Sequence, residues 1–285
     1  MITKAVVLCG GLATRYLPYC KTIPKEMLPV IDRPLIQCIV EELCDAGIKE
    51  ILIILGRGKE CIVNHFDKNI ELYDRLIATK KWNELESVQR LDRMAKISYI
   101  RQISPRGTGD AVARAESWVG GKPFLMCFGD EMFIGGKNVY KNLMEAYTNN
   151  GNLTLATMEV EDRLIPLYGI VAKSTTDEYY KISKFVEKPR IEDAPSNRAY
   201  AGPAVLDDRI FRYISMTPEI NLEVSLADAY NLAIKEGALY GKVIEAEKLD
   251  LGNKLGFVKG NLLAALNRDD MRDEIISTMN EYITK

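Results

Sequence analysis

Residues 8–30, LCGGLATRYLPYCKTIPKEMLPV, follow directly on the short apolar run KAVV at residues 4–7. An apolar run that ends in glycines is typical of a buried strand leading into a tight turn, where glycine lets backbone amides approach a ligand closely. Arg15 lies just downstream and could add a charge-assisted contact to phosphate. The pattern is neither GxGxxG nor GxxxxGK[ST], which disfavours a dinucleotide fingerprint and a P-loop. These residues predict a phosphate-binding turn of another kind; the alternative is a strand-to-helix turn with no ligand.

The second half of this segment presents a lysine on a stiffened loop. Pro24 and Pro29 restrict the backbone on either side of Lys25, whereas Lys21 lies further upstream. A solvated basic loop is the simpler interpretation. The two prolines favour a rigidly displayed Lys25 that meets phosphate.

The overall composition limits the possible partners. The chain has 285 residues, 47% of them hydrophobic, which is enough for one large domain or one domain with an appendage. Its net charge of −2 provides no general attraction to nucleic acid or to an anionic membrane, so we expect neither as a partner. The longest apolar runs, such as ILIIL at 51–55, have the length of strands and cannot span a bilayer. The N-terminal residues lack the features of a signal peptide, and we expect a cytoplasmic protein.

Metal-thiolate and histidine chemistry are disfavoured. None of the six cysteines forms a CxxC pair, which argues against a zinc site, and we expect reduced, mostly buried thiols. His65 is the only histidine, and a lone histidine is more often structural than catalytic.

Strand-like and helix-like runs alternate through the first half of the chain. The strand-like runs are 4–10, 50–56, 96–102 and 123–131, and the helix-like runs are 34–47, 59–67 and 107–119. A charged, helix-forming stretch at 69–96 predicts a surface excursion. The alternation predicts an α/β fold with an open, mostly parallel, Rossmann-like mixed sheet and helices on both faces. Ligands bind such sheets beyond the carboxyl ends of the strands, where the glycine turn lies.

The second half is richer in strands and ends in a helical arm. Strands are expected at 152–160, 168–173, 182–189, 200–206 and 239–246, with a helix at 225–237. Residues 254–285 show a helical apolar pattern that either packs on the same domain or meets a second subunit. With no long linker, we expect one domain over 1–285, whose main parts are 1–150, 151–250 and 254–285.

Acidic residues follow two strand-like runs. Asp130 and Glu131 come directly after FLMCFG, and Asp250 precedes a glycine turn. Carboxylates in such positions suit Mg²⁺, which shares oxygen ligands with substrate phosphates, although an acid that caps a helix would look the same. Glu187 and Lys188 stand before Pro189, and both can serve one ligand only if the strand ends there. The alternative is an exposed ion pair.

Taken together and in order, these segments resemble the bacterial UTP–glucose-1-phosphate uridylyltransferases of the sugar-nucleotide transferase superfamily. The resemblance runs from residue 2 to about 275 and is strongest in TIPKEMLPVIDRPLIQ, RGTGDAV, FGDE, YGIV, FVEKP, APSN and LGNKLGF. It implies transfer of a uridylyl group from UTP to glucose 1-phosphate with release of pyrophosphate. Another sugar 1-phosphate, dTTP in place of UTP, and a non-catalytic nucleotide-sugar sensor are the alternatives.

The resemblance also implies roles for individual residues. Nucleotide contacts would come from Gly10, Gly11, Thr14, Arg15, Gln102 and Gly107. Contacts to the sugar and its phosphate would come from Gly169, Glu187 and Lys188. Asp130 and Asp250 would hold Mg²⁺, and Arg15, Lys25 and Lys188 would neutralise charge during the reaction. The family further implies a homodimer or homotetramer.

Three places depart from the family pattern. The usual AGLGTR opening is GGLATR here, so Ala13 replaces a glycine. The usual GDEIQLTDA is NLEVSLADA at 221–229, and Pro203 occupies a commonly basic position. We expect these last changes to cluster on the sugar side of the site.

Overall fold

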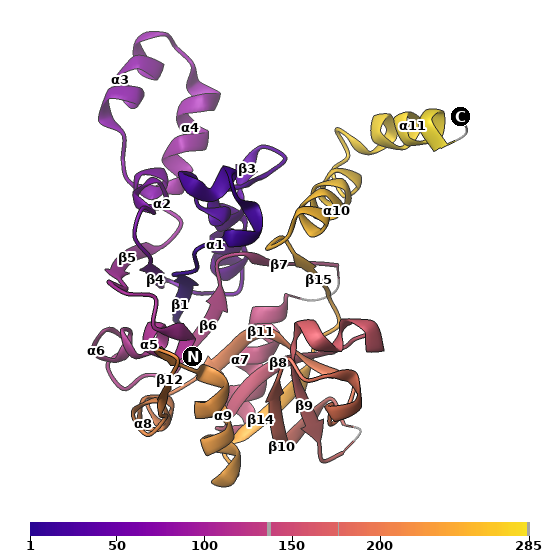
Figure 1. Cartoon of the computed structure of the whole chain (residues 1–285). Coiled ribbons are helices and arrows are strands. Elements are labelled where there is room, and N and C mark those ends of the chain that lie inside the picture. The colour runs from indigo at the N-terminus through magenta and orange to yellow at the C-terminus, as the bar shows by residue number, and fades with distance from the viewer. Residues whose placement is uncertain (136–137, 176, 284–285) are drawn as a thin grey trace.

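The computed structural model describes residues 1–135, 138–175 and 177–283, and a nine-stranded mixed sheet runs through it (Figure 1). The strand order is β5–β4–β1–β6–β11–β8–β14–β10–β9. The strands are β1 (Lys4–Cys9), β4 (Glu50–Leu55), β5 (Lys96–Arg101), β6 (Phe124–Phe128), β8 (Leu153–Glu159), β9 (Gly169–Lys173), β10 (Tyr179–Glu187), β11 (Arg198–Leu206) and β14 (Leu239–Val243).

The sheet is parallel in its first part and largely antiparallel in its second. Strands β5, β4, β1 and β6 run parallel to one another, as the alternating pattern predicts. Strand β11 is antiparallel to both β6 and β8, and β10 is antiparallel to both β14 and β9. Strand β9 also pairs with β11 through Ile170 and Ala199. Both β1 and β4 are buried along five consecutive residues, because helices cover both faces of the parallel part.

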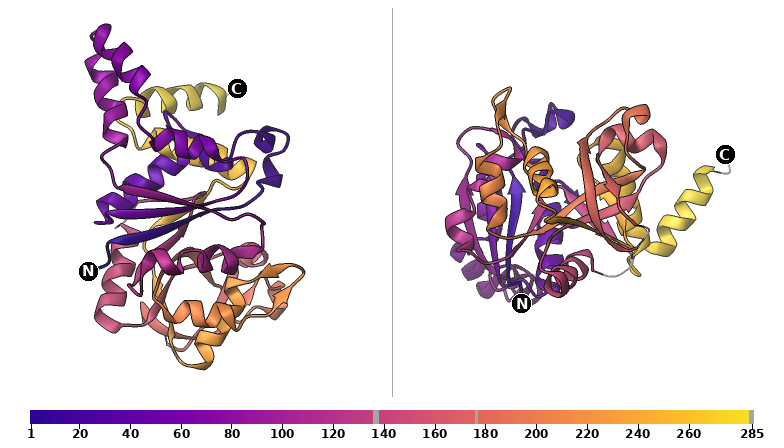
Figure 2. Two further views of the ribbon diagram at one scale, coloured as in Figure 1. Left: turned by 90° about the vertical axis from the view of Figure 1, so that its left-hand side faces the viewer. Right: turned by 90° about the horizontal axis from the view of Figure 1, so that it is seen from below.

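Helices pack on both faces of the sheet (Figure 2). Successive side chains of a strand point to opposite faces. Val7 of β1 therefore packs with α1 (Leu35–Asp45), α2 (Glu60–Phe66) and α7 (Val139–Asn150). Val6 and Leu8 pack with α5 (Gly107–Ala113), α8 (Arg209–Ser215) and α9 (Leu226–Lys235).

Several predicted elements differ in detail from the structure. The helix expected at 107–119 is divided into α5 and the short α6 (Glu116–Val119). The excursion at 69–96 is confirmed as two helices, α3 (Ile70–Ala78) and α4 (Trp82–Leu91), which project at the top of Figure 1. The C-terminal arm consists of α10 (Lys254–Leu266) and α11 (Arg272–Ile283) rather than one helix, and α11 points away from the body. Of this arm, 284–285 lie outside the described residues.

Apart from the strand before Asp250, the shortest elements of the structure have no counterpart among the predicted ones. Three small sheets join β2 (Pro29–Val30) with β3 (Arg33–Pro34), β7 (Glu131–Ile134) with β15 (Glu247–Asp250), and β12 (Glu219–Ile220) with β13 (Glu223–Val224). The 3₁₀ turns are η1 (Thr14–Tyr16), η2 (Tyr19–Lys21), η3 (Lys25–Met27), η4 (Asp162–Leu167) and η5 (Ile191–Asp193). Helices α7 and α8 were also missed. Across the described ranges, the structure contains no helix with the length and apolar character needed to cross a membrane.

Ala13 adopts the left-handed conformation that glycine favours. Its φ and ψ are 52° and 37°, immediately before η1. This conformation costs an L-residue other than glycine about 1–2 kcal/mol. Replacement by glycine would relieve this strain, but glycine also gives the unfolded chain more conformational entropy, which offsets part of the gain. We therefore expect Ala13→Gly to raise the free energy of unfolding by about 0.5–1 kcal/mol in urea titrations.

A second alanine-to-glycine substitution, expected to lower the free energy of unfolding, serves as the control for Ala13→Gly. Ala78 lies in the exposed helix α3. Because Ala78 is the last residue of α3, where glycine costs less than in a helix interior, Ala78→Gly should lower the free energy of unfolding by about 0.5 kcal/mol. A loss of stability in Ala13→Gly as well would contradict the strain at residue 13.

Candidate functional site

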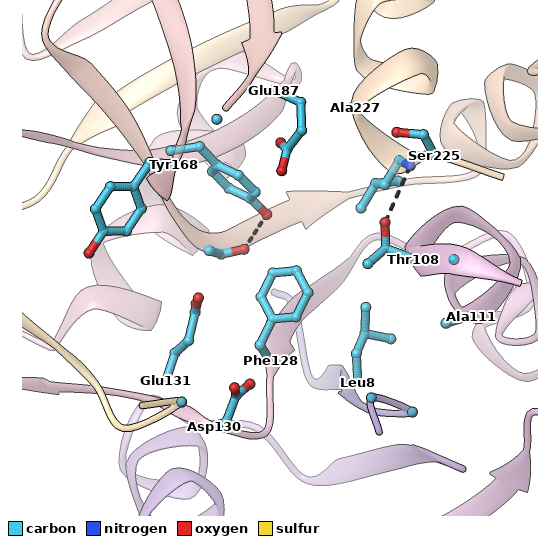
Figure 3. Close-up of a pocket in the computed structure, with 18 of the residues that line it drawn as sticks. Leu8, Thr108, Ala111, Phe128, Asp130, Glu131, Tyr168, Glu187, Ser225 and Ala227 are labelled. Atoms are coloured by element: carbon cyan, nitrogen blue, oxygen red, sulfur yellow. Dashed lines mark hydrogen bonds between the residues drawn. The ribbon is translucent and has the colours of Figure 1, made fainter. Parts of the chain in front are cut away.

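A cavity of about 790 Å³ lies at the carboxyl ends of β1 and β6 and is bordered on its far side by β9 and β10 (Figure 3). Every site residue predicted from the sequence lines it. These residues are Gly10, Gly11, Thr14, Arg15, Lys25, Gln102, Gly107, Asp130, Gly169, Glu187, Lys188 and Asp250. The parallel part of the sheet brings together the residues that follow β1, β5 and β6, because neighbouring parallel strands end at the same edge.

The glycine turn after β1 lies against two functional side chains. A Cβ on Gly10 would lie 2.6 Å from Gln102 Oε1, and one on Gly11 would lie 3.6 Å from Lys25 Nζ. A side chain at residue 10 would therefore displace Gln102. Thr14 and Arg15 follow in η1 and are exposed to the cavity. The glycine turn thus lies beside the Gln102 amide, the Lys25 ammonium group and the Arg15 guanidinium group.

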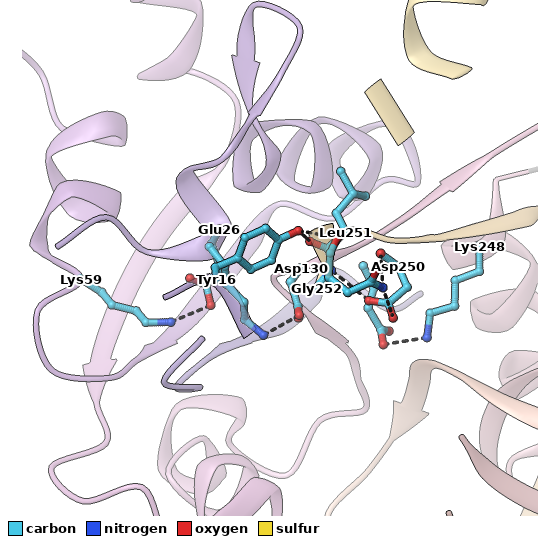
Figure 4. A network of polar contacts seen from close by, with 11 residues as sticks. Tyr16, Glu26, Lys59, Asp130, Lys248, Asp250, Leu251 and Gly252 are labelled. Carbon is cyan, nitrogen blue, oxygen red and sulfur yellow. Dashed lines mark hydrogen bonds and ion pairs between the residues drawn. The ribbon is translucent and has the colours of Figure 1, made fainter. Parts of the chain in front are cut away.

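Lys25 forms an ion pair inside the cavity. Its Nζ lies 2.5 Å from Asp130 Oδ2 (Figure 4). Burial alone would lower the pKa of Lys25, but the negative charges of Asp130 and Glu26 outweigh burial and raise its pKa. Lys25 therefore remains a cation, and a bound phosphate would find its charge already in place.

The neighbouring residue, Glu26, forms a buried ion pair that fixes the backbone at Lys25. Glu26 is fully buried, and Lys59 Nζ lies 2.6 Å from its Oε1. Burial raises the pKa of Glu26, and the positive charges of Lys59 and Lys25 partly offset this effect. The two adjacent residues have different partners, since Lys25 pairs with Asp130 and Glu26 pairs with Lys59. The rigid display of Lys25 therefore depends on this buried pair as well as on the flanking prolines.

Asp130 and Asp250 flank one small space. A Cβ on Gly252 would lie 2.8 Å from Asp250 Oδ1 and 3.1 Å from Asp130 Oδ2, so the glycine keeps open the point that both carboxylates face. Gly252 N donates to Asp250 Oδ1 over 2.9 Å, which orients that carboxylate. Pairing of β7 with β15 brings the two acids together, since Asp250 stands opposite Glu131 in the ladder.

These carboxylates fit a divalent cation that obtains its other ligands from a substrate. Within residues 1–135, 138–175 and 177–283, no cluster of three or more His, Cys, Asp or Glu side chains could hold a metal. Two carboxylates beside an open space are the donor set that Mg²⁺ uses when phosphates and waters complete its coordination.

A buried ion pair beside the two carboxylates was only partly anticipated. Lys248 Nζ lies 2.7 Å from Glu131 Oε1 and 5.1 Å from the centre of the Tyr168 ring. Burial raises the pKa of Glu131 to about 7, against the opposing charge of Lys248. Lys248 was missed because nothing in the strand EKLD at 247–250 indicates that it pairs with Glu131, which is distant in the sequence.

Tyr16 connects the glycine turn to the loop after Asp250. Its hydroxyl lies 2.5 Å from Leu251 O and 2.7 Å from Asn253 O, and donates to these carbonyls. Burial, with a contribution from the charge of Asp250, raises the pKa of Tyr16 to about 12, so the hydroxyl remains a donor at neutral pH. No local pattern reveals this contact, because its partners are far away in the sequence.

On the far side of the cavity, β10 ends at Glu187 and the backbone changes direction at Lys188. Lys188 has a φ of 45°, and its Nζ lies 3.4 Å from Glu187 Oε1. The strand ends two residues earlier than the expected 182–189, and this end allows the side chains of Glu187 and Lys188 both to line the cavity. A Cβ on Gly169 would lie 2.4 Å from Phe185 Cζ and 3.1 Å from Glu187 Oε2, so glycine is needed there for close packing.

The segment at 221–229 carries departures from the family pattern that we expect on the sugar side of the site. Val224 N donates to Arg106 O over 2.8 Å, and a Cβ on Gly107 would lie 2.7 Å from Val224 O. The hairpin β12–β13 therefore covers the start of α5, and Ser225 and Ala227 line the cavity beside Thr108 (Figure 3). Pro203 is absent from the residues that line the cavity.

The remaining sequence expectations concern His65 and the cysteines. His65 Nε2 lies 3.0 Å from Gln37 Oε1, and burial lowers the pKa of its imidazole. It does not line the cavity, which agrees with a structural role. All six cysteines are free thiols, and three of them are buried.

Comparison with known proteins agrees with this geometry. The nucleotidyl transferase family model matches residues 4–265. The UTP–glucose-1-phosphate uridylyltransferase 2 of Staphylococcus saprophyticus is 37% identical, over 100% of this chain and 98% of that protein. The UTP-bound UDP-glucose pyrophosphorylase structure from Acinetobacter baumannii superimposes with a TM-score of 0.92 at 32% identity, over 99% of both chains. A pyrophosphorylase complexed with UDP-glucose gives a TM-score of 0.85 at 32% identity, over 94% of this chain and 100% of that one. The chain therefore belongs to the nucleotidyl transferase family, among relatives named UTP–glucose-1-phosphate uridylyltransferases.

Proposed function

We propose that this protein transfers the uridylyl group of UTP to glucose 1-phosphate and releases pyrophosphate. One observation carries the proposal: a single cavity collects the glycine turn, the lysine of η3, the paired carboxylates and the Glu187–Lys188 strand end. The names of the full-length relatives and the ligands of the superimposed structures, UTP and UDP-glucose, support the choice of substrates.

In the proposed reaction, an oxygen of the sugar phosphate attacks the α-phosphorus of UTP in line, and the bond to pyrophosphate breaks. The attacking oxygen is an anion at neutral pH, so the reaction needs no general base. The protein must instead bring two polyanions together and stabilise charge on the transition state. We assign this work to Arg15, Lys25 and Lys188, all of which line the cavity.

Asp130 and Asp250 are the residues that would hold Mg²⁺. A metal ion bound there would neutralise charge on the triphosphate and polarise the reacting phosphoryl group. The space kept open by Gly252 supports this assignment, because both carboxylates face it. In the free protein Lys25 neutralises Asp130, so metal and lysine compete for the same carboxylate.

The remaining predicted residues divide between the two substrates. Gly10, Gly11, Thr14, Gln102 and Gly107 surround the proposed nucleotide position. Gly169 and Glu187 lie on the opposite side, with Lys188, where sugar hydroxyls and the sugar phosphate would bind. The chain would thus act as one nucleotidyltransferase domain, with 1–150 holding mainly the nucleotide and 151–250 mainly the sugar.

A substrate panel tests the proposal. Pyrophosphate release is measured with each nucleoside triphosphate against each of several sugar 1-phosphates, with Mg²⁺ present. We expect the highest kcat/KM for UTP with glucose 1-phosphate. Faster turnover with dTTP would overturn the choice of base, faster turnover with another sugar would overturn the choice of sugar, and nucleotide binding without turnover would indicate a sensor.

We further propose that the protein forms a homodimer or homotetramer through its C-terminal arm. Helix α11 projects from the body, none of its side chains is buried, and Ile276 and Ile283 are 44% and 75% exposed. A helix of this length is marginal in water without a packing partner. Sedimentation at low concentration should give a dimer or larger species for the intact chain, and a smaller species for Ile276→Lys.

The six free thiols are consistent with a cytoplasmic location, where disulfides are rare.

A further inference from the structure

We infer that Asp110 sets the base preference of this protein by fixing the orientation of the Gln102 side-chain amide. Gln102 is 5% exposed and follows β5 at the edge of the cavity. Its Nε2 donates to Asp110 Oδ2 over 2.7 Å and to Gly107 O over 3.2 Å. The inference rests on the proposed role of Gln102 in contacting the base.

The chemistry of the two partners determines which end of the amide faces them. An ionised carboxylate and a backbone carbonyl can only accept hydrogen bonds. The NH₂ end of Gln102 must therefore point toward Asp110 and Gly107, and both of its hydrogens are used there. A flipped amide would place its own oxygen against two acceptors, which is strongly unfavourable.

The carbonyl end of Gln102 is then the part available to a ligand. Its Oε1 lies 2.6 Å from the position that a Cβ on Gly10 would occupy, beside the glycine turn. Among residues 1–135, 138–175 and 177–283, no hydrogen-bond donor is assigned to this oxygen. The site therefore presents a single fixed acceptor to the edge of the base.

A fixed acceptor discriminates between pyrimidines. Uracil carries a hydrogen on N3 and can donate to Oε1, whereas N3 of cytosine is itself an acceptor and would meet Oε1 with two lone pairs facing each other. Thymine shares the N3 hydrogen of uracil, so this contact does not separate UTP from dTTP. Asp110 is thus a positioning residue that favours uracil and thymine over cytosine.

The carboxylate of Asp110 is itself held in place by a second contact, to Arg114. Its other oxygen, Oδ1, accepts from Arg114 Nη2 over 3.1 Å, one turn later in the chain. The two carboxylate oxygens therefore have separate partners, and the contact to Arg114 can be removed without removing the contact to Gln102.

The test compares kcat/KM for UTP with kcat/KM for CTP in Asp110→Asn. Asparagine has nearly the same shape but offers both a donor and an acceptor, so both orientations of the Gln102 amide become possible. We expect the ratio of UTP to CTP to fall by about 10- to 100-fold, the discrimination that one such base contact supports. Asp110→Ala, which lacks the acceptor altogether, should lower the ratio in the same direction.

Two further variants separate the possible outcomes. Arg114→Gln keeps Asp110 Oδ2 on Gln102 and should leave the ratio unchanged, whereas an equal fall would mean that α5 had merely been disturbed. Gln102→Ala should lower the ratio, and no change in it would defeat the proposed role of Gln102 itself. If Gln102→Ala lowers the ratio and both Asp110 variants retain it, only the present inference fails.

Discussion

Replacing Asp130 with asparagine should lower kcat/KM for UTP and glucose 1-phosphate about a thousandfold. The substitution keeps the shape of the side chain and removes the charge that faces the space beside Gly252. Loss of metal-assisted charge stabilisation is worth several kcal/mol, and roughly 4 kcal/mol corresponds to this factor. Asp250→Asn should have an effect of similar size, because the two carboxylates face the same point.

Metal binding provides the decisive measurement for this prediction. Electron paramagnetic resonance of Mn²⁺ added to the protein with UTP should show bound metal for the natural chain and much weaker binding for Asp130→Asn. Asp208→Asn is a matched control, because Asp208 is exposed at the start of α8 and does not line the cavity. Unchanged turnover in Asp130→Asn would refute the assigned metal role.

Replacing Lys25 with methionine should lower kcat about 100- to 1,000-fold, the usual cost of losing one charge-stabilising donor in a transition state. Methionine preserves the apolar stem of lysine and removes the ammonium group that lies 2.5 Å from Asp130. Because Lys25 neutralises Asp130 in the free protein, its removal should leave Mn²⁺ affinity unchanged or higher. A fall in kcat without a loss of metal affinity would distinguish Lys25 from Asp130 and Asp250, the carboxylates proposed to hold the metal.

Lys21 supplies the control for Lys25. It lies on the same loop, is exposed, and does not line the cavity. Lys21→Met should retain nearly full turnover. Equal losses in the two variants would indicate that the loop needs positive charge in general, and retention of turnover in both would remove Lys25 from the catalytic groups.

Local sequence was sufficient to predict the core of the sheet and one side of the site. Residues 5–9 and 51–55 are apolar without interruption because both faces of these strands are covered, and this signal lies within each strand. The glycine turn and Asp130 were predicted correctly as cavity residues, since both follow strands that end at one edge. Short stretches of sequence are therefore enough to predict that the glycine turn and Asp130 lie at the same edge of the sheet.

Contacts between distant residues could not be predicted in this way. The orientation of Gln102 depends on Asp110, and the setting of Asp250 depends on the pairing of β15 with β7. The packing of the hairpin β12–β13 was not predicted, because nothing within it specifies that Val224 packs on Gly107. Short strands such as these have little periodicity, so packing with the rest of the chain determines where they lie.

The sequence by itself determined the parallel core, the glycine turn at the end of β1 and the identity of the charged residues that surround it. The tertiary structure alone decided that Asp130 and Asp250 face one space, that Tyr16 ties the glycine turn to the loop after Asp250, and that Ala13 takes the left-handed conformation. The physical reason is the range of the interactions. Apolar periodicity and turn residues act between neighbours in the chain, whereas the geometry of the site depends on contacts that form only when the whole sheet has assembled.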